Sequence, residues 1–308
     1  MSARGIKKKT PRVMAFVAAV LFLAVFVAGY LFLSGKYREL FDLAPAESAG
    51  AHEDSAAPPA ENGDTLSGRF TAPDGFIRME AGESSFAEYL RRLPLKPSGE
   101  KALFYDGKEK DASKYAAVLD MDIGDRDLQQ SPDIIIRLYA EYLFSQERFP
   151  EISFHFVSEF ECSWDKWREG YRVEVDGNDA KWVKKDEPDS SKESFLQYLN
   201  IIYAYASTAS LPNELEKADP AAMKIGDVFV HAEKPGYAAV VADMAEGSSG
   251  EMCFLLVMGG DPAQQPQVLI NAEEEQPGPW FIIPDKLEGG IETAEYDFEW
   301  DELMRFEQ

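Results

Sequence analysis

Apolar and polar positions recur with two different periods along the chain. The clearest helical pattern covers residues 127–144, where apolar side chains return every three or four positions. Only Asp133, Arg137 and Glu141 form a polar stripe on this segment. We predict a helix with Ser131 as its N-cap. Because apolar residues cover most of its surface, this helix is expected to lie in the interior of the domain.

A second helix and a series of strands follow. The second helix is predicted to begin at Ser190 or Ser191 and to continue through Tyr203. Beyond Ile225 the pattern changes to short apolar runs between glycines and prolines. The predicted strands are Val228–His231, Tyr237–Asp243, Cys253–Met258, Gln267–Ile270 and Trp280–Ile283. Helices followed by consecutive antiparallel strands indicate an α+β fold, and the acidic stretch after Asp285 is expected to lie over its surface.

The first 34 residues have the pattern of a membrane anchor. Residues 1–12 carry five basic side chains and no acidic one, and residues 13–34 form an uncharged apolar run long enough to cross a bilayer. We predict a single transmembrane signal anchor with its N-terminus in the cytoplasm and the remaining chain in the periplasm or outside the cell. A cleaved signal peptide is the rival interpretation, disfavoured by the length of the run. Residues 44–68 are expected to form a disordered tether to an exported domain at 69–308.

Composition narrows the class of partner. The chain holds 31 Lys and Arg against 55 Asp and Glu, a net charge of −24, and five of the basic residues precede the apolar run. Repulsion of this size argues against nucleic acid and polyanionic cell-wall polymers as partners. The expected partners are the membrane, through the N-terminal helix, and an envelope protein or small ligand of unknown identity.

The two cysteines and the acidic residues suggest little chemistry of their own. Cys162 and Cys253 could form one disulfide, and the sequence leaves open whether they do. Neither cysteine begins a helix, so neither is an attractive nucleophile. Three scattered histidines have no zinc spacing, and the acidic run 120–127 lacks the glycine and the final acid of a calcium loop. We therefore predict no metal and no cofactor. Asp227 and Asp243 are expected to accept hydrogen bonds from turn amides.

Several short segments, taken in order, carry a family resemblance. They are FAEYLRRLPL at 86–95, DLQQ at 127–130, RLYAEY at 137–142, WREG at 167–170, YAYASTASL at 203–211, GDVF at 226–229, PG at 235–236, VVADM at 240–244 and PAQ at 262–264. Over residues 75–280 the chain resembles domain-of-unknown-function family 4846, an uncharacterised family of exported bacterial proteins. A helix-borne nucleophile, then a Gly-Asp strand and a His strand, is similar to the layout of papain-like cell-wall peptidases of the NlpC type. This second resemblance implies a papain-like fold with the central helix on an antiparallel sheet.

The resemblance also implies a Cys/His site, from which this chain departs at three positions. The family pattern has Cys where this chain has Ser131, His where it has Tyr237, and a Gln-Ser pair where it has Met258 and Gly259. A cysteine nucleophile needs a nearby imidazole to hold it as the thiolate. Tyrosine ionises only near pH 10, and methionine neither donates nor takes up a proton. We interpret the domain as a catalytically inactive relative that serves as a binding or scaffolding module in the cell envelope.

An active hydrolase is the alternative. In a peptidase- or amidase-like mechanism, Ser131 would be the nucleophile and His231 or another group the base, provided that the strands on either side of residues 232–236 form a hairpin. For ligand contacts, the candidates are Gln129 and Gln130 beside the helix N-terminus, and Trp164 and Trp167 as the wall of a cleft. The simpler interpretations are a serine that only caps the helix and tryptophans that belong to the core.

Overall fold

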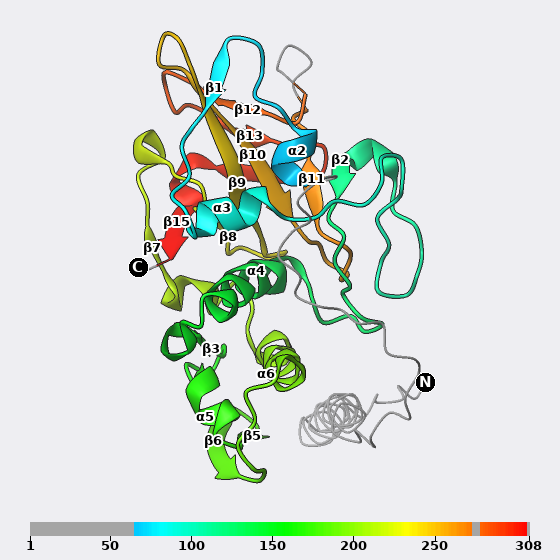
Figure 1. Cartoon of the computed structure of the whole chain (residues 1–308), viewed down its shortest axis with the longest axis vertical. Coiled ribbons are helices and arrows are strands. Elements are labelled where there is room, and N and C mark those ends of the chain that lie inside the picture. Colours follow the sequence, from blue (N-terminus) through cyan, green and yellow to red (C-terminus); the bar gives the residue numbers. More distant parts are fainter. Residues whose placement is uncertain (1–64, 273–277, 307–308) are drawn as a thin grey trace, which may run out of the picture. The chain divides into compact units, whose positions relative to one another are not determined.

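The computed structural model describes residues 65–272 and 278–306, which all belong to the second of the two units of the chain, residues 57–308. A nine-stranded antiparallel sheet forms its centre (Figure 1). Seven strands follow the order β2-β11-β10-β9-β8-β15-β7. In addition, β1 pairs with β9, and β12 pairs with β10. The strands are β1 (Phe76–Arg78), β2 (Tyr115–Val118), β7 (Leu215–Lys217), β8 (Val228–His231), β9 (Tyr237–Gly247), β10 (Met252–Met258), β11 (Gln267–Leu269), β12 (Phe281–Ile283) and β15 (Leu303–Phe306).

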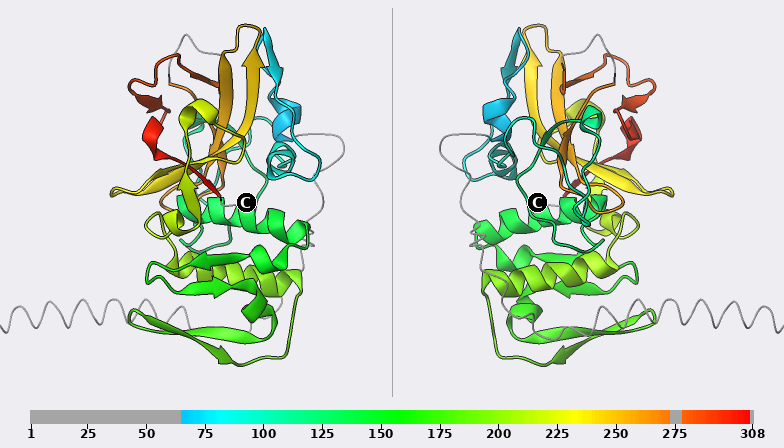
Figure 2. Two further views of the ribbon diagram at one scale, coloured as in Figure 1. Left: turned by 90° about the vertical axis from the view of Figure 1, so that its left-hand side faces the viewer. Right: turned by 90° about the vertical axis from the view of Figure 1, so that its right-hand side faces the viewer.

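The helices and three small hairpins complete the unit. The α-helices are α2 (Leu66–Arg69), α3 (Phe86–Arg91), α4 (Ser131–Ser145), α5 (Trp164–Arg168) and α6 (Lys192–Tyr205), and the 3-10 helices are η1 (Ala112–Lys114), η2 (Phe149–Glu151), η3 (Leu211–Asn213), η4 (Pro220–Ala222) and η5 (Trp300–Glu302). The hairpins pair β3 (Ser153–His155) with β4 (Glu161–Ser163), β5 (Tyr171–Asp176) with β6 (Asp179–Lys184), and β13 (Gly290–Glu292) with β14 (Asp297–Glu299). In Figure 2, α4 lies between the sheet and the layer that contains α6 and the β5–β6 hairpin.

The two faces of β9 bury different cores. Its run of small and β-branched residues is apolar on both sides, which is typical of a strand covered on both faces. Ala238 and Val240 belong to the cluster that includes α4 and α6, whereas Ala239 and Val241 belong to the cluster that includes Phe298 and other residues of the C-terminal segment. This alternation decides which side chains of β9 can meet α4.

The predicted α+β, papain-like fold is wrong. The structure is mostly antiparallel β-sheet with few helices, since the main sheet takes in strands that the sequence pattern did not reveal. The acidic C-terminal stretch, expected to lie over the surface, instead supplies β15, which pairs with both β8 and β7. Phe306 in β15 stacks on Tyr139 of α4 with ring centroids 3.8 Å apart, and Arg305 forms two hydrogen bonds with Asp227, at 2.6 and 2.7 Å.

The N-terminal predictions fall mostly beyond the described part. The cytoplasmic tail at 1–12, the transmembrane anchor at 13–34 and the tether up to residue 64 lie outside the described residues. Within residues 65–272 and 278–306, none of the helices combines the length and apolar character that a membrane span requires. The predicted end of the tether is wrong, because Thr65 caps α2 and the side chain of Leu66 is buried in the core.

Both cysteines are free and buried. Cys162 lies on β4 of a small hairpin, whereas Cys253 lies on β10 in the main sheet between Ala245 and Ile282. The disulfide that the sequence left open is therefore not formed.

Candidate functional site

The site suggested by the sequence begins at the N-terminus of α4. The N-cap is Gln130, one residue before the predicted cap at Ser131. Gln130 has extended backbone, and its N–H donates to Oδ2 of Asp133 at 3.1 Å. The Asp133 N–H donates in turn to the Gln130 carbonyl at 3.0 Å. Since these bonds close the first turn, the Ser131 hydroxyl is not required as a cap.

The Ser131 hydroxyl bonds to the backbone of β9. It donates to the Ala238 carbonyl at 2.9 Å and accepts from the Ala238 N–H at 2.6 Å, and the residue is 1% exposed. The Val241 N–H donates to the carbonyl of Asp227, directly before β8, at 2.8 Å. The backbone groups of successive strand residues point to alternate sides, so those of Ala238 point to the opposite side, where β10 runs. Pairing with β10 ends at Val240 and Val257. Ser131 therefore satisfies two backbone groups that β10 no longer reaches.

Tyr237 precedes Ala238, and its side chain lies on the other face of β9. Its hydroxyl donates to the Asp297 carbonyl at 2.6 Å, and its ring packs with the cluster that includes the C-terminal segment. Burial, followed by the charge of Glu302, raises the pKa of the Tyr237 hydroxyl, which disfavours the phenolate. Met258 is fully buried in the same cluster. The structure thus brings positions 131 and 237 to adjacent residues of β9 but directs them to opposite faces.

His231 lies opposite Tyr237 in the β8–β9 hairpin, as the hairpin prediction required. The two rings stack with centroids 4.5 Å apart and planes 15° apart. Nδ1 of His231 lies 2.6 Å from Oε1 of Glu302. Its described partners are therefore on the face of the sheet that Tyr237 occupies, whereas Ser131 belongs to α4, which packs against the face that carries Ala238.

The glutamines beside the helix start hold neighbouring protein groups. The amide of Gln129 donates to the Ile123 carbonyl at 3.0 Å, and its oxygen accepts from Arg137 at 2.7 Å. Arg137 also pairs with Glu141 at 3.0 Å, so the polar stripe of α4 lies inside the molecule. The Gln130 amide, which is partly exposed, approaches the carboxylates of Asp127 and Asp261 at 3.2 and 3.3 Å.

The two candidate tryptophans lie in an aromatic cluster of the helical layer. Trp164 is fully buried, with its ring centroid 5.5 Å from that of Phe195 and 5.6 Å from that of Tyr198. Trp167 is also buried, and its ring centroid lies 5.9 Å from that of Tyr198. The guanidinium carbon of Arg172 lies 4.2 Å from the centroid of the Trp167 ring. These contacts are those of core residues.

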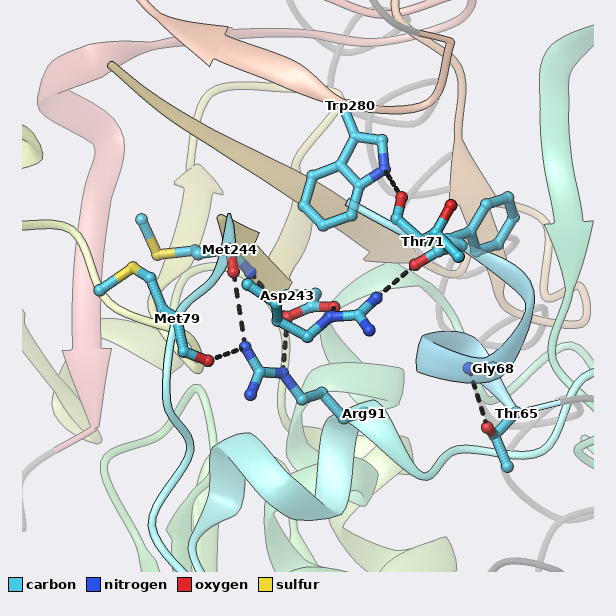
Figure 3. A network of polar contacts seen from close by, with 10 residues as sticks. Thr65, Gly68, Thr71, Met79, Arg91, Asp243, Met244 and Trp280 are labelled. Carbon is cyan, nitrogen blue, oxygen red and sulfur yellow. Dashed lines mark hydrogen bonds and ion pairs between the residues drawn. The ribbon is translucent and has the colours of Figure 1, made fainter. Parts of the chain in front are cut away.

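Sequence reasoning missed a buried charge network at the centre of β9 (Figure 3). The side chain of Asp243 is completely buried and accepts from Nε of Arg91 at 2.6 Å and from Nε of Arg78 at 2.7 Å. Arg91 also donates to the Met79 carbonyl at 2.6 Å. Asp243 also accepts from the N–H of its neighbour Met244 at 2.8 Å, but both residues lie within β9, so the predicted role in a turn is wrong. An acid inside the apolar run 240–244 was the available signal, since buried charges require partners.

The corresponding prediction for Asp227 is confirmed. Its Oδ2 accepts from the Lys224 N–H at 2.8 Å, in addition to the bonds from Arg305. Both aspartates thus join β-strands to segments distant in sequence. Within the described ranges, no three His, Cys, Asp or Glu side chains gather as ligands for a metal ion.

These observations define an antiparallel β-sheet domain in which the serine at the start of a buried helix is bonded to the backbone of the sheet. The model of the family described as Domain of unknown function (4846) matches residues 66–305, and the chain belongs to this family. No curated protein and no solved structure matches the chain. The family resemblance is therefore confirmed, and the resemblance to NlpC-type peptidases has no support.

Proposed function

We propose that this domain is a non-catalytic binding module of the cell envelope. One observation carries the proposal: the Ser131 hydroxyl, at the position where the family resemblance implies a nucleophile, forms two hydrogen bonds with the Ala238 backbone. The location in the envelope is part of the proposal and comes from the sequence alone.

The bonding of Ser131 opposes a role in catalysis. A nucleophilic serine needs a base within hydrogen-bond reach and an oxygen that can approach the substrate. Here the oxygen is buried, and turning it toward a substrate would leave the Ala238 amide and carbonyl without partners. An unpaired buried backbone group costs about 1–3 kcal/mol. The hydrogen bonds of Ser131 therefore support a structural role and oppose a role as a nucleophile.

The competing proposal is a hydrolase in which His231 activates Ser131. It would require His231 to leave Glu302 and the ring of Tyr237, and to reach the other face of β9. General-base catalysis requires a heavy-atom separation of about 2.6–3.2 Å between base and nucleophile. The contacts of both residues favour the binding module.

A fluorophosphonate probe separates the two proposals. The full-length chain, Ser131→Ala and Ser194→Ala are incubated with the probe and examined by intact-mass spectrometry. Ser194 is a matched control because its hydroxyl is also buried. We expect no adduct on any of the three proteins. An adduct on the wild-type chain and on Ser194→Ala that is absent from Ser131→Ala would overturn the proposal.

A further inference from the structure

Four side chains form a row across the end of the main sheet where β1, β9, β10 and β12 meet. Ile77 pairs with Glu246, Glu246 with Met252, and Met252 with Ile283. Residues paired directly across antiparallel strands point to the same face of a sheet. We call these four residues the tip row. Figures 1 and 2 show β1 beside the far end of the β9–β10 hairpin.

The tip row continues a buried apolar face into solvent. The next row on this face contains Met244, Phe254 and Phe281, which are buried in the cluster that includes Trp300. Within the tip row, by contrast, Ile77 is 78% exposed, and Met252 and Ile283 are only partly buried. Leu287, which follows β12, is 39% exposed. Single exposed apolar residues are ordinary on protein surfaces, whereas apolar side chains that lie together on one face are typical of interaction sites.

A carboxylate stands inside this apolar row. Glu246 is exposed between Ile77 and Met252, and the described residues form no salt bridge with it. The exposed acids Glu80 and Glu251 lie close by in sequence, Glu80 two residues after β1 and Glu251 directly before β10. A second copy of this chain would place carboxylate against carboxylate, which opposes self-association through this row. The charge instead complements a basic side chain flanked by apolar ones.

We propose that the tip row is a docking surface for a protein segment in which large aliphatic side chains flank a lysine or arginine. The aliphatic groups would cover Ile77, Met252 and Ile283, and the basic group would pair with Glu246. The flexible Met252 side chain suits such a surface because it adapts to neighbours of different shape. This inference rests on the proposed binding function, for which it names a surface and a class of partner.

Methyl NMR on the full-length chain tests the proposal with a defined probe. The probe is an end-capped peptide, Leu-Ser-Lys-Ser-Leu, whose alternate residues face one side when extended. The comparison peptide has glutamate in place of lysine. We expect the lysine peptide to shift the methyl signals of Ile77, Met252 and Ile283, and the glutamate peptide to bind at least about tenfold more weakly.

Two variants and a control locate the binding. Ile77→Asp is expected to weaken binding of the lysine peptide by about tenfold or more, and Glu246→Lys to reverse the preference between the peptides. Val157→Asp changes another exposed apolar residue, 56% exposed and distant in sequence, and is expected to leave binding unchanged. Thermal melting checks that each variant is folded. Absence of shifts at the tip row, an equal loss in Val157→Asp, or equal binding of the two peptides would overturn the proposal.

The peptide-binding test of the tip row and the fluorophosphonate test of Ser131 can fail independently of each other. A fluorophosphonate adduct at Ser131 together with peptide binding at the tip row would reject the non-catalytic assignment and retain the docking surface. No adduct and no peptide binding would reject the docking surface alone.

Discussion

Two hydrogen bonds join Ser131, in the first turn of α4, to the backbone of Ala238 in the main sheet. The hydroxyl donates to the carbonyl of Ala238 at 2.9 Å and accepts from its amide at 2.6 Å. The contact takes the place of strand pairing, because β10 pairs with β9 only as far as Val240. A residue at the position expected for a nucleophile thereby becomes part of the hydrogen bonding of the sheet.

Replacing Ser131 with alanine is expected to destabilise the fold. The change leaves two buried backbone groups of Ala238 without their partner, which should lower the free energy of unfolding by about 1–3 kcal/mol. Ser194→Ala is the matched control, since the Ser194 hydroxyl is buried without a hydrogen-bond partner and its removal should be neutral or stabilising. Urea unfolding of both variants measures the difference. Equal effects of the two substitutions would show that the Ser131 bonds contribute nothing.

Restoring the family's residue types is not expected to restore a reactive thiol. In Ser131→Cys with Tyr237→His, the new imidazole would start from the face of β9 that packs against Phe298 of β14, whereas the thiol would lie on the side of β9 where α4 packs. The rate of alkylation by iodoacetamide at pH 7 should therefore equal that of Ser131→Cys alone. The two native thiols are buried and should contribute little. A much faster reaction in the double variant would contradict the opposite-face arrangement.

The buried Asp243 is expected to be essential for stability. Asp243→Ala leaves the guanidinium groups of Arg91 and Arg78 without their carboxylate, at a cost of about 3–5 kcal/mol when a buried pair loses one partner. Glu151→Ala removes the partner of Arg148 in an ion pair open to solvent and should cost less than about 1 kcal/mol. Chemical unfolding, or loss of soluble folded protein for Asp243→Ala, provides the measurement. Similar effects of both changes would exclude a special role for the network.

Asp133 is expected to make stability depend on pH. Burial raises the pKa of its carboxyl well above the ordinary value, so the folded state holds the proton more tightly than the unfolded state. This contribution to stability is complete below the unfolded pKa of about 3.9 and is lost as the pH rises through the folded pKa. Asp133→Asn removes the titration. The free energy of unfolding of the variant should therefore rise relative to wild type between pH 4.5 and pH 8.

Asp106 offers a comparison of opposite sign for this measurement. Its hydrogen bond from Lys108 lowers the pKa of its carboxyl, so its contribution is present above the unfolded pKa and is lost as the pH falls. Asp106→Asn should therefore give a pH dependence that differs in direction from that of Asp133→Asn. A flat difference between wild type and Asp133→Asn across the range would contradict the raised pKa of the buried carboxyl.

Much of the local structure followed from the pattern of residues. The helix over 127–144 was predicted one residue from its actual cap, and the strands at 228–231, 237–243 and 253–258 were found because their apolar runs are long and clearly bounded. Strands of three or four residues, such as β1, β7 and β15, were missed because so few positions cannot display a period. Those short strands are what changed an expected α+β fold into a mostly antiparallel sheet.

The candidate site depended on contacts that no local pattern contains. The Ser131 hydroxyl bonds to the backbone of Ala238, which directly follows Tyr237 on β9. Which face of β9 receives α4 depends on how the strand pairs and packs, and that choice separates the two side chains. The partners of Asp243 likewise come from β1 and α3, more than 150 residues earlier in the chain.

By itself, then, the sequence determined the family, the acidic character and the positions of the longer helices and strands, because these depend on composition and on interactions between near neighbours. Only the tertiary structure decided that Ser131 bonds to the sheet, that residues 303–306 form a strand between β8 and β7, and that Ile77, Glu246, Met252 and Ile283 share one partly exposed row. Strand register and the choice of buried face arise from pairing between distant segments, whose energies are settled together when the core is packed.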